Sequence, residues 1–169
     1  DSYIPNSHPL YTPDVNLYPH DPVEGAALLD TVGWKDLDND PATPRTALNI
    51  PDVPTGTELN LTYITTTSLQ RRQASEILAE SLSECGVGVN LQYLPPESFY
   101  ASGPDGALFG REFDLAQFSM GSESLVPRCD WFGTNAIPNG DNDWQGANLS
   151  GYSNTDFDAT CEQAAFALP

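Results

Sequence analysis

Apolar and polar residues alternate in several short stretches of the chain. Between the first two of these stretches, the apolar residues recur at the spacing of a helix. Residues 58–66 and 87–93 carry apolar side chains among Thr, Asn and Gln, a pattern typical of strands. Residues 113–118 read as a third strand, after a predicted short helix at 97–101. This order of strand, helix, strand, short helix and strand predicts an α/β fold with parallel pairing.

The stretch after the first strand predicts a helix that begins behind Ser68 and ends at Gly86. Apolar or small side chains recur there at steps of three and four residues, as on one face of a helix. The expected face consists of Leu69, Ala74, Ile77, Leu78, Ser81, Leu82 and Cys85.

Two further helices are expected outside this core. Asp21 is suited to cap a helix with Pro22 at its first position and Gly33 at its end. Asn154 is suited to cap a last helix that runs to about residue 165. Residues 1–20 are rich in proline and predict an extended strap, and residues 36–57 are expected to be irregular. The apolar face of the earlier helix would consist of Ala26, Leu28, Leu29 and Val32.

The net negative charge of the chain limits the classes of partner that it can bind. The chain has 24 acidic and 6 basic residues, a formal net charge of −18. Binding to nucleic acid depends on Lys and Arg meeting phosphates, so nucleic acid is excluded as a partner, and docking on anionic membranes is disfavoured. The length of 169 residues suits one compact domain. We interpret the chain, which opens on Asp1 without a signal peptide or initiator Met, as a piece of a longer protein.

Three cysteines occur. Cys129 and Cys161 flank an irregular region rich in Gly and Asn, and a disulfide between them would pin that region. Their spacing does not match a zinc site, because no CxxC or nearby His accompanies them. The bridge would imply an oxidising, extracytoplasmic compartment. Cys85 is interpreted as a small buried hydrophobic residue.

Catalytic and metal-binding patterns are weak. Asp36, Asp38 and Asp40 resemble the start of a calcium loop, but Pro41 stands where the loop needs Gly, so a solvated acidic turn is the favoured interpretation and calcium the alternative. His8 and His20 lie in the proline-rich strap, and no GxSxG motif is present. Aromatic residues after the third strand would either pack that region or contact a ligand; they are Trp131, Phe132, Trp144 and Tyr152.

Four segments together resemble the peptide-type (family 5) substrate-binding proteins of bacterial ABC importers. The first two are the Tyr-Pro-x-Asp-Pro segment at 18–22, with Leu-Leu and Gly-Trp following, and the helix-to-strand turn at 78–91. The others are Phe-Asp-Leu-Ala at 113–116 and Gly-Tyr-Ser-Asn at 151–154 with Phe-Asp following. The resemblance implies a lobe of the type II periplasmic-binding-protein fold, with a mostly parallel sheet flanked by helices, spanning residues 1–169.

The resemblance also implies a function: an extracytoplasmic receptor, often lipid-anchored, that holds a peptide or another small solute between two lobes and delivers it to a membrane permease. No cofactor and no metal are expected, and the N-terminal lobe would be missing from this chain. The rival interpretations are an extracellular hydrolase that uses acidic residues and a purely structural extracellular module.

The expected contact edge follows the third strand, because ligands in open α/β sheets bind beyond the carboxyl ends of the strands. By the resemblance, Glu123 stands where an acidic residue meets the amino terminus of a bound peptide. The chain differs from relatives at Met120 and Gly121, where they carry Trp or Cys, and at Gln117, where some carry Arg. The predicted ligand-binding residues are Met120, Gly121, Ser122, Glu123, Ser124 and Trp144.

Overall fold

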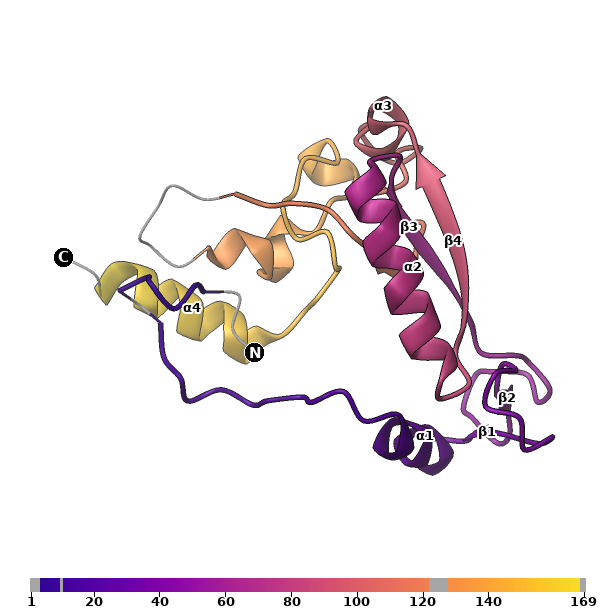
Figure 1. Cartoon of the computed structure of the whole chain (residues 1–169). Coiled ribbons are helices and arrows are strands. Elements are labelled where there is room, and N and C mark those ends of the chain that lie inside the picture. The colour runs from indigo at the N-terminus through magenta and orange to yellow at the C-terminus, as the bar shows by residue number, and fades with distance from the viewer. Residues whose placement is uncertain (1–3, 10, 122–127, 168–169) are drawn as a thin grey trace. The chain divides into compact units, whose positions relative to one another are not determined.

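The computed structural model describes residues 4–9, 11–121 and 128–167 (Figure 1). Their contacts divide the chain into two compact units. The loop unit comprises Asp1–His20, Ser102–Arg111 and Ser119–Pro169, and the sheet unit comprises Asp21–Ala101 and Glu112–Phe118. The single lobe expected over residues 1–169 stays a prediction, and each unit is described by itself.

A three-stranded parallel sheet forms the core of the sheet unit. Strand β3 (Asn60–Thr66) lies in the centre, with β4 (Gly88–Leu94) on one side and β5 (Leu115–Ala116) on the other. Both neighbours run parallel to β3, and Tyr63 is the Cα partner of Leu91 in β4 and of Leu115 in β5. The predicted α/β order with parallel pairing is therefore confirmed.

The central strand is buried more continuously than the sequence indicated. Its last four residues, 63–66, are all buried, and Ile64 and Thr65 are 0% exposed. The apolar and polar side chains of this half of β3 are thus buried alike, although their alternation correctly predicted a strand. The reason is its central place, because strands in the middle of a parallel sheet are covered on both faces.

Helix α2 (Leu69–Ser83) connects β3 to β4 and contacts both strands, as Figure 1 shows. The expected apolar face was partly wrong, because Leu69 and Ile77 are each 69% exposed and the buried residue is Ser75. The Ser75 hydroxyl donates to the Arg72 carbonyl at 2.8 Å and lies 3.4 Å from the Tyr93 hydroxyl of β4. A small side chain at this point brings the helix close to the sheet.

Helix α3 (Pro96–Phe99) covers part of the sheet with the fully buried ring of Phe99. It begins one residue before the predicted range, with Pro96 at a position that suits proline. Strand β5 is shorter than the predicted 113–118. The residues around it still belong to the sheet, because the Asp114 carboxylate accepts a hydrogen bond from the Thr62 N–H at 2.7 Å.

Arg45 holds the edge of the sheet unit together. Helix α1 (Pro22–Thr31) is capped by Asp21 as predicted and is followed by β1 (Trp34–Lys35) and β2 (Thr46–Ala47), an antiparallel pair. The pair corrects the expectation that residues 36–57 are wholly irregular. The buried Arg45 guanidinium donates to the carbonyls of Trp34 and Cys85 at 3.1 and 2.8 Å. Helix α1 itself buries no residue, so its expected apolar face lies near the surface.

The loop unit has little regular structure apart from its last helix. Its described part contains three 3-10 turns, η1 (Cys129–Trp131), η2 (Thr134–Ala136) and η3 (Gly140–Asn142), followed by α4 (Thr155–Ala167). Asn154 caps α4 as predicted, since its side-chain oxygen accepts from the N–H groups of Asp156 and Phe157. Residues 4–9 and 11–20 form neither helix nor strand, as expected for a strap.

Asn148 organises the interior of the loop unit. It is 0% exposed, and its amide nitrogen donates to the carbonyls of Gly133 and Tyr152 at 2.9 and 2.7 Å. Its side-chain oxygen accepts from the Ser150 hydroxyl at 2.9 Å. One buried amide thus joins three points of a long irregular segment, which explains how the segment keeps a defined shape without strands.

Candidate functional site

The carboxyl ends of the three parallel strands meet at one edge of the sheet, where the sequence predicted a site. Strands β3, β4 and β5 end at Thr66, Leu94 and Ala116. The chain leaves β3 through Thr67 and Ser68 to reach α2, and leaves β5 through Gln117 and Phe118. The edge is therefore rich in hydroxyl and amide groups, which can orient a small polar ligand.

Arg71 brings a positive charge to this edge. It lies in the first turn of α2, and its Nη1 is 3.3 Å from both the Thr66 Oγ1 and the Tyr100 hydroxyl. Tyr100 follows α3, is 43% exposed and contacts the Phe99 ring edge-on with ring centroids 4.8 Å apart. The guanidinium and the two hydroxyls thus form a polar cluster that sequence analysis missed, because it depends on packing between α2 and α3.

Gln117 shows an unusual hydrogen-bonding state. Its backbone is tied to β3, since its N–H donates to the Ile64 carbonyl at 3.0 Å and its carbonyl accepts from the Thr65 hydroxyl at 2.9 Å. Its side-chain Oε1 is buried and is the one such atom in the described part of the chain without a hydrogen-bond partner. An unpaired buried acceptor costs about 1–3 kcal/mol, so a donor from water or ligand would be stabilised here.

The predicted contact residues after β5 are only partly described. Ser122, Glu123 and Ser124 lie outside the described residues. Met120 is 39% exposed, and the Cα of Gly121 faces open space. The chain passes from the sheet unit to the loop unit between Phe118 and Ser119. All five residues from 120 to 124 therefore stay predicted ligand contacts.

Trp144 also stays a predicted contact. Its ring packs against Gly103, where even a Cβ atom would come within 2.5 Å of the indole. It is half-buried and has a left-handed backbone, with φ of 58°. The described contacts bring it to Gly103, on another segment of the loop unit. One face of the indole is thus occupied by the protein itself.

The other aromatic residues of the region pack within the loop unit. Phe132 and Tyr152 both contact Phe157 of α4 edge-on, with ring centroids 6.2 and 5.8 Å apart. The Arg128 guanidinium stacks over the Trp131 ring, with the Arg128 Cζ 5.1 Å from the ring centroid. These contacts favour the packing interpretation, and ligand contact stays the untested alternative.

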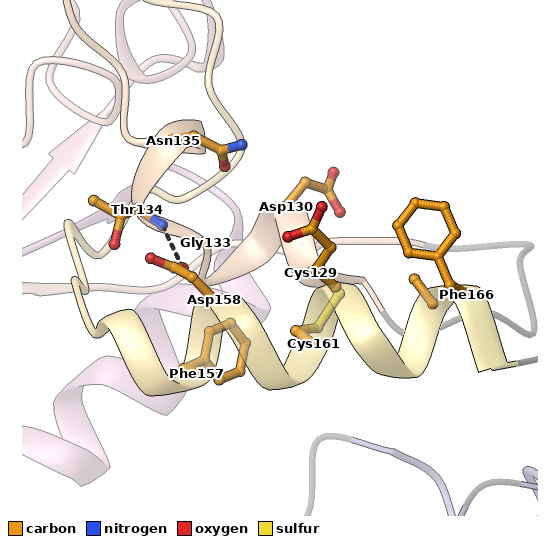
Figure 2. Close-up of a pocket in the computed structure, with 11 residues that line it drawn as sticks. Cys129, Asp130, Gly133, Thr134, Asn135, Phe157, Asp158, Cys161 and Phe166 are labelled. Carbon is orange, nitrogen blue, oxygen red and sulfur yellow. Dashed lines mark hydrogen bonds between the residues drawn. A yellow bond between two sulfur atoms is a disulfide. The ribbon is translucent and has the colours of Figure 1, made fainter.

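The predicted disulfide between Cys129 and Cys161 is confirmed, with a Cα–Cα distance of 5.7 Å. It joins η1 to α4 and lines a groove of about 650 Å³ that sequence analysis missed (Figure 2). Beside the disulfide the Thr134 N–H donates to the Asp158 carboxylate of α4 at 3.0 Å, a second link between the same two segments. The lining residues are Cys129, Asp130, Gly133, Thr134, Asn135, Phe157, Asp158, Cys161, Glu162, Ala165 and Phe166.

Asp130 gives the groove a negative charge that is partly compensated. Its two oxygens accept from Nε and Nη2 of Arg128 at 2.8 and 2.6 Å. These hydrogen bonds hold the pKa of the Asp130 carboxyl below its ordinary value. The carboxylate therefore stays ionised through the neutral and mildly acidic range.

The acidic turn at 36–40 is built from local hydrogen bonds. The Asp36, Asp38 and Asp40 carboxylates accept from the N–H groups of residues 39, 40 and 42. Bonds to the Asp40 N–H and the Thr43 hydroxyl keep the pKa of Asp38 below its ordinary value. Within the described ranges, no three His, Cys, Asp or Glu side chains gather as a metal site would require.

None of the described helices is long and apolar enough to cross a membrane.

Solved structures provide the comparison with known proteins. The oligopeptide-binding protein of Thermus thermophilus, solved with a pentapeptide, is similar over 96% of this chain, with a TM-score of 0.79 and 24% identity. The oligopeptide-binding protein AppA of Bacillus subtilis, solved with a nonapeptide, covers 90% at a TM-score of 0.64 and 20% identity. NikZ of Campylobacter jejuni, solved with Ni(L-His), covers 89% at a TM-score of 0.64 and 16% identity.

These likenesses confirm the expected fold class, an α/β fold of the kind found in periplasmic binding proteins. The chain spans 27% of the length of each of these three proteins. No protein-family model matches the sequence, and no curated protein matches it.

Proposed function

We propose that the chain is one lobe of an extracytoplasmic solute-binding receptor that serves an ABC importer. Its cargo is a peptide or a related small solute, and its partners are a second lobe and a membrane permease. The receptor holds its cargo without chemical change, and needs no cofactor to do so.

The observation that carries this proposal is the match of fold over 96% of the chain to a protein solved with a pentapeptide. The polar edge of the sheet supports it, because Thr66, Arg71 and Tyr100 gather where ligands of open α/β sheets bind. Residues 119–121, which follow the half-buried Gln117 and Phe118, are all exposed. A solute can therefore reach the start of the predicted contact segment.

The proposed mechanism is closure of two lobes around the cargo. A ligand that contacts both lobes binds the closed state better than the open state and shifts the population toward it by that difference in affinity. Glu123 would receive the ammonium group of a peptide in a charge-assisted hydrogen bond. The Gln117 amide, whose Oε1 lacks a donor, would accept a hydrogen bond from the cargo.

The disulfide supports the proposed location. A bridge between Cys129 and Cys161 forms and persists in oxidising compartments. We place the protein outside the cytoplasmic membrane, and lipid anchoring is part of the proposal.

A titration followed by nuclear magnetic resonance tests the proposal on this chain. A pentapeptide is added to the isotope-labelled protein, and an N-acetylated pentapeptide serves as the matched control. With one lobe supplying half of the contacts, we expect binding at about millimolar concentration. Signals of residues 117–121 should shift, and the acetylated peptide should shift them less because it lacks the ammonium group.

Three results would argue against the proposal. Shifts confined to residues far from 117–121 would place the binding site elsewhere. Cleavage of the peptide, read by mass spectrometry, would favour the hydrolase. An absence of shifts with peptides, sugars and metal complexes alike would favour a structural module.

A further inference from the structure

In the described part of the chain, the side-chain bonds and ring contacts that attach helix α4 to the loop unit lie in its first two turns. Phe157, Asp158 and Cys161 are the half-buried residues of the helix, and the rest of it is exposed. Phe157 contacts two aromatic rings, Asp158 accepts from the Thr134 N–H, and Cys161 is bonded to Cys129. Figure 2 shows the last two attachments side by side along the groove.

Among the residues that the structure describes, none forms a comparable attachment to the helix beyond Cys161. Residues 162–167 are all exposed, and Phe166 is 82% exposed. None of these six residues takes part in a described hydrogen bond, ion pair or ring contact outside the helix. No basic residue stands in the last turn to complement the helix dipole. A helix of 13 residues is marginal in water on its own, so this half depends on its attachment at Cys161.

The groove depends on the same attachment. One wall is formed by α4, and the other by the segment that contains η1 and η2. The lining residues of α4 are Phe157, Asp158, Cys161, Glu162, Ala165 and Phe166, and those of the segment are Cys129, Asp130, Gly133, Thr134 and Asn135. Cys161 is the last of the described attachments of α4, so loss of this bond releases the part of the wall that Glu162, Ala165 and Phe166 form.

We propose that the Cys129–Cys161 bridge is a redox latch that keeps the second half of α4 folded and the groove formed. A small dithiol reduces it with two electrons and two protons: the S–S bond breaks, both cysteines become thiols, and the dithiol closes to its own disulfide. Both cysteines line the groove, so the dithiol can reach them. The rest of the loop unit keeps its fold in the reduced state, since its interior rests on Asn148, Leu149 and Leu108. This inference does not depend on the proposed function.

Hydrogen exchange read by mass spectrometry tests the latch on the whole chain. The oxidised protein is compared with the protein reduced by dithiothreitol and with the double variant Cys129→Ala, Cys161→Ala. We expect the amides of residues 161–167 to exchange about tenfold faster or more in both latch-free forms. Amides of β3 and β4 should keep their rates, and reoxidation should restore α4.

The variant Cys85→Ser is the matched control, because it removes the free thiol and leaves the bridge intact. It should exchange like the oxidised protein in α4. Unchanged exchange of 161–167 after reduction would overturn the proposal. Equal acceleration throughout the loop unit would also overturn it, because the bridge would then be a general staple of that unit.

Discussion

The Arg45 Nη1 donates to the Asp30 Oδ1 at 3.1 Å, although the Arg45 side chain is 7% exposed and that of Asp30 is 47% exposed. A buried guanidinium is thus paired with a carboxylate that remains in contact with water. The pair joins α1 to the residue that precedes β2. The two carbonyls that also accept from Arg45 extend the connection to β1 and to the turn after α2. Gly86 of that turn packs directly on the Arg45 side chain.

Replacement of Arg45 by Met should therefore destabilise the sheet unit. The variant leaves the Trp34 and Cys85 carbonyls without their donor, and we expect the free energy of unfolding to fall by about 2–4 kcal/mol. Urea denaturation followed by circular dichroism measures it. Arg72→Met is the control, because Arg72 is exposed and stacks on Tyr93, a contact that contributes about 0.5–1 kcal/mol. Equal losses in the two variants would contradict the role given to Arg45.

Asn148→Leu should loosen the loop unit. The substitution removes the donor for the Gly133 and Tyr152 carbonyls, and we expect a loss of about 2–4 kcal/mol in the free energy of unfolding. Asn135→Ala, an exposed position, should change it by less than about 0.5 kcal/mol. Hydrogen exchange of residues 133–153 locates the effect. A uniform effect in both units would show that Asn148 does not act locally.

The Arg128–Asp130 pair predicts a pH dependence. Because the pKa of Asp130 is lowered in the folded state, its contribution to stability is present above about pH 4 and is lost as the pH falls through the folded pKa. The pair is partly exposed, so the contribution is below about 1 kcal/mol. Asp130→Asn should lower the free energy of unfolding at pH 7, and the loss should shrink as the pH falls through the folded pKa of Asp130. Urea denaturation at a series of pH values measures it.

The double variant Asp130→Asn, Arg128→Gln checks this origin. If the hydrogen-bonded pair is the source, the second substitution adds little at pH 7. Additive losses at pH 7 would instead assign the effect to separate contacts of the two residues.

Loss of a polar side-chain group should change the free energy of unfolding in opposite directions at Thr65 and at Gln117. Thr65→Val removes the hydrogen bond from the Thr65 hydroxyl to the Gln117 carbonyl, and we expect a loss of about 1 kcal/mol. Gln117→Met removes a buried oxygen without a partner, so stability should stay equal or rise by up to about 1 kcal/mol. Urea denaturation compares the two. A clear loss in Gln117→Met would indicate that a buried water satisfies Oε1.

The parallel sheet could be predicted from the sequence because its signals are local. The β-branched residues at 60–66 indicate the central strand over a few positions. The helices outside the sheet could be predicted for the same reason, because Asp21 and Asn154 act as local capping residues. The pair β1–β2 could not be predicted, since two-residue strands carry no period and depend on the buried Arg45 between them. The apolar face of α2 was misjudged at Leu69 and Ile77, where spacing alone does not tell which face meets the sheet.

The location of the candidate site could be predicted from the sequence, but the side chains that form it could not. The rule for strand ends pointed to the edge beyond β5, but the cluster of Arg71, Thr66 and Tyr100 arises from side chains that lie far apart in the sequence. The groove beside α4 carried one signal, the spacing of Cys129 and Cys161, and that signal indicated a bridge without its cavity.

The division into two units has a practical consequence for protein engineering. The backbone crosses from one unit to the other four times, after His20, Ala101, Arg111 and Phe118. Truncation from either terminus therefore cannot isolate one complete unit, and a sheet unit cut at Ala101 would lack the edge strand that residues 112–118 supply. A minimal sheet unit would need a designed connector between residues 101 and 112, in place of residues 102–111, which belong to the loop unit.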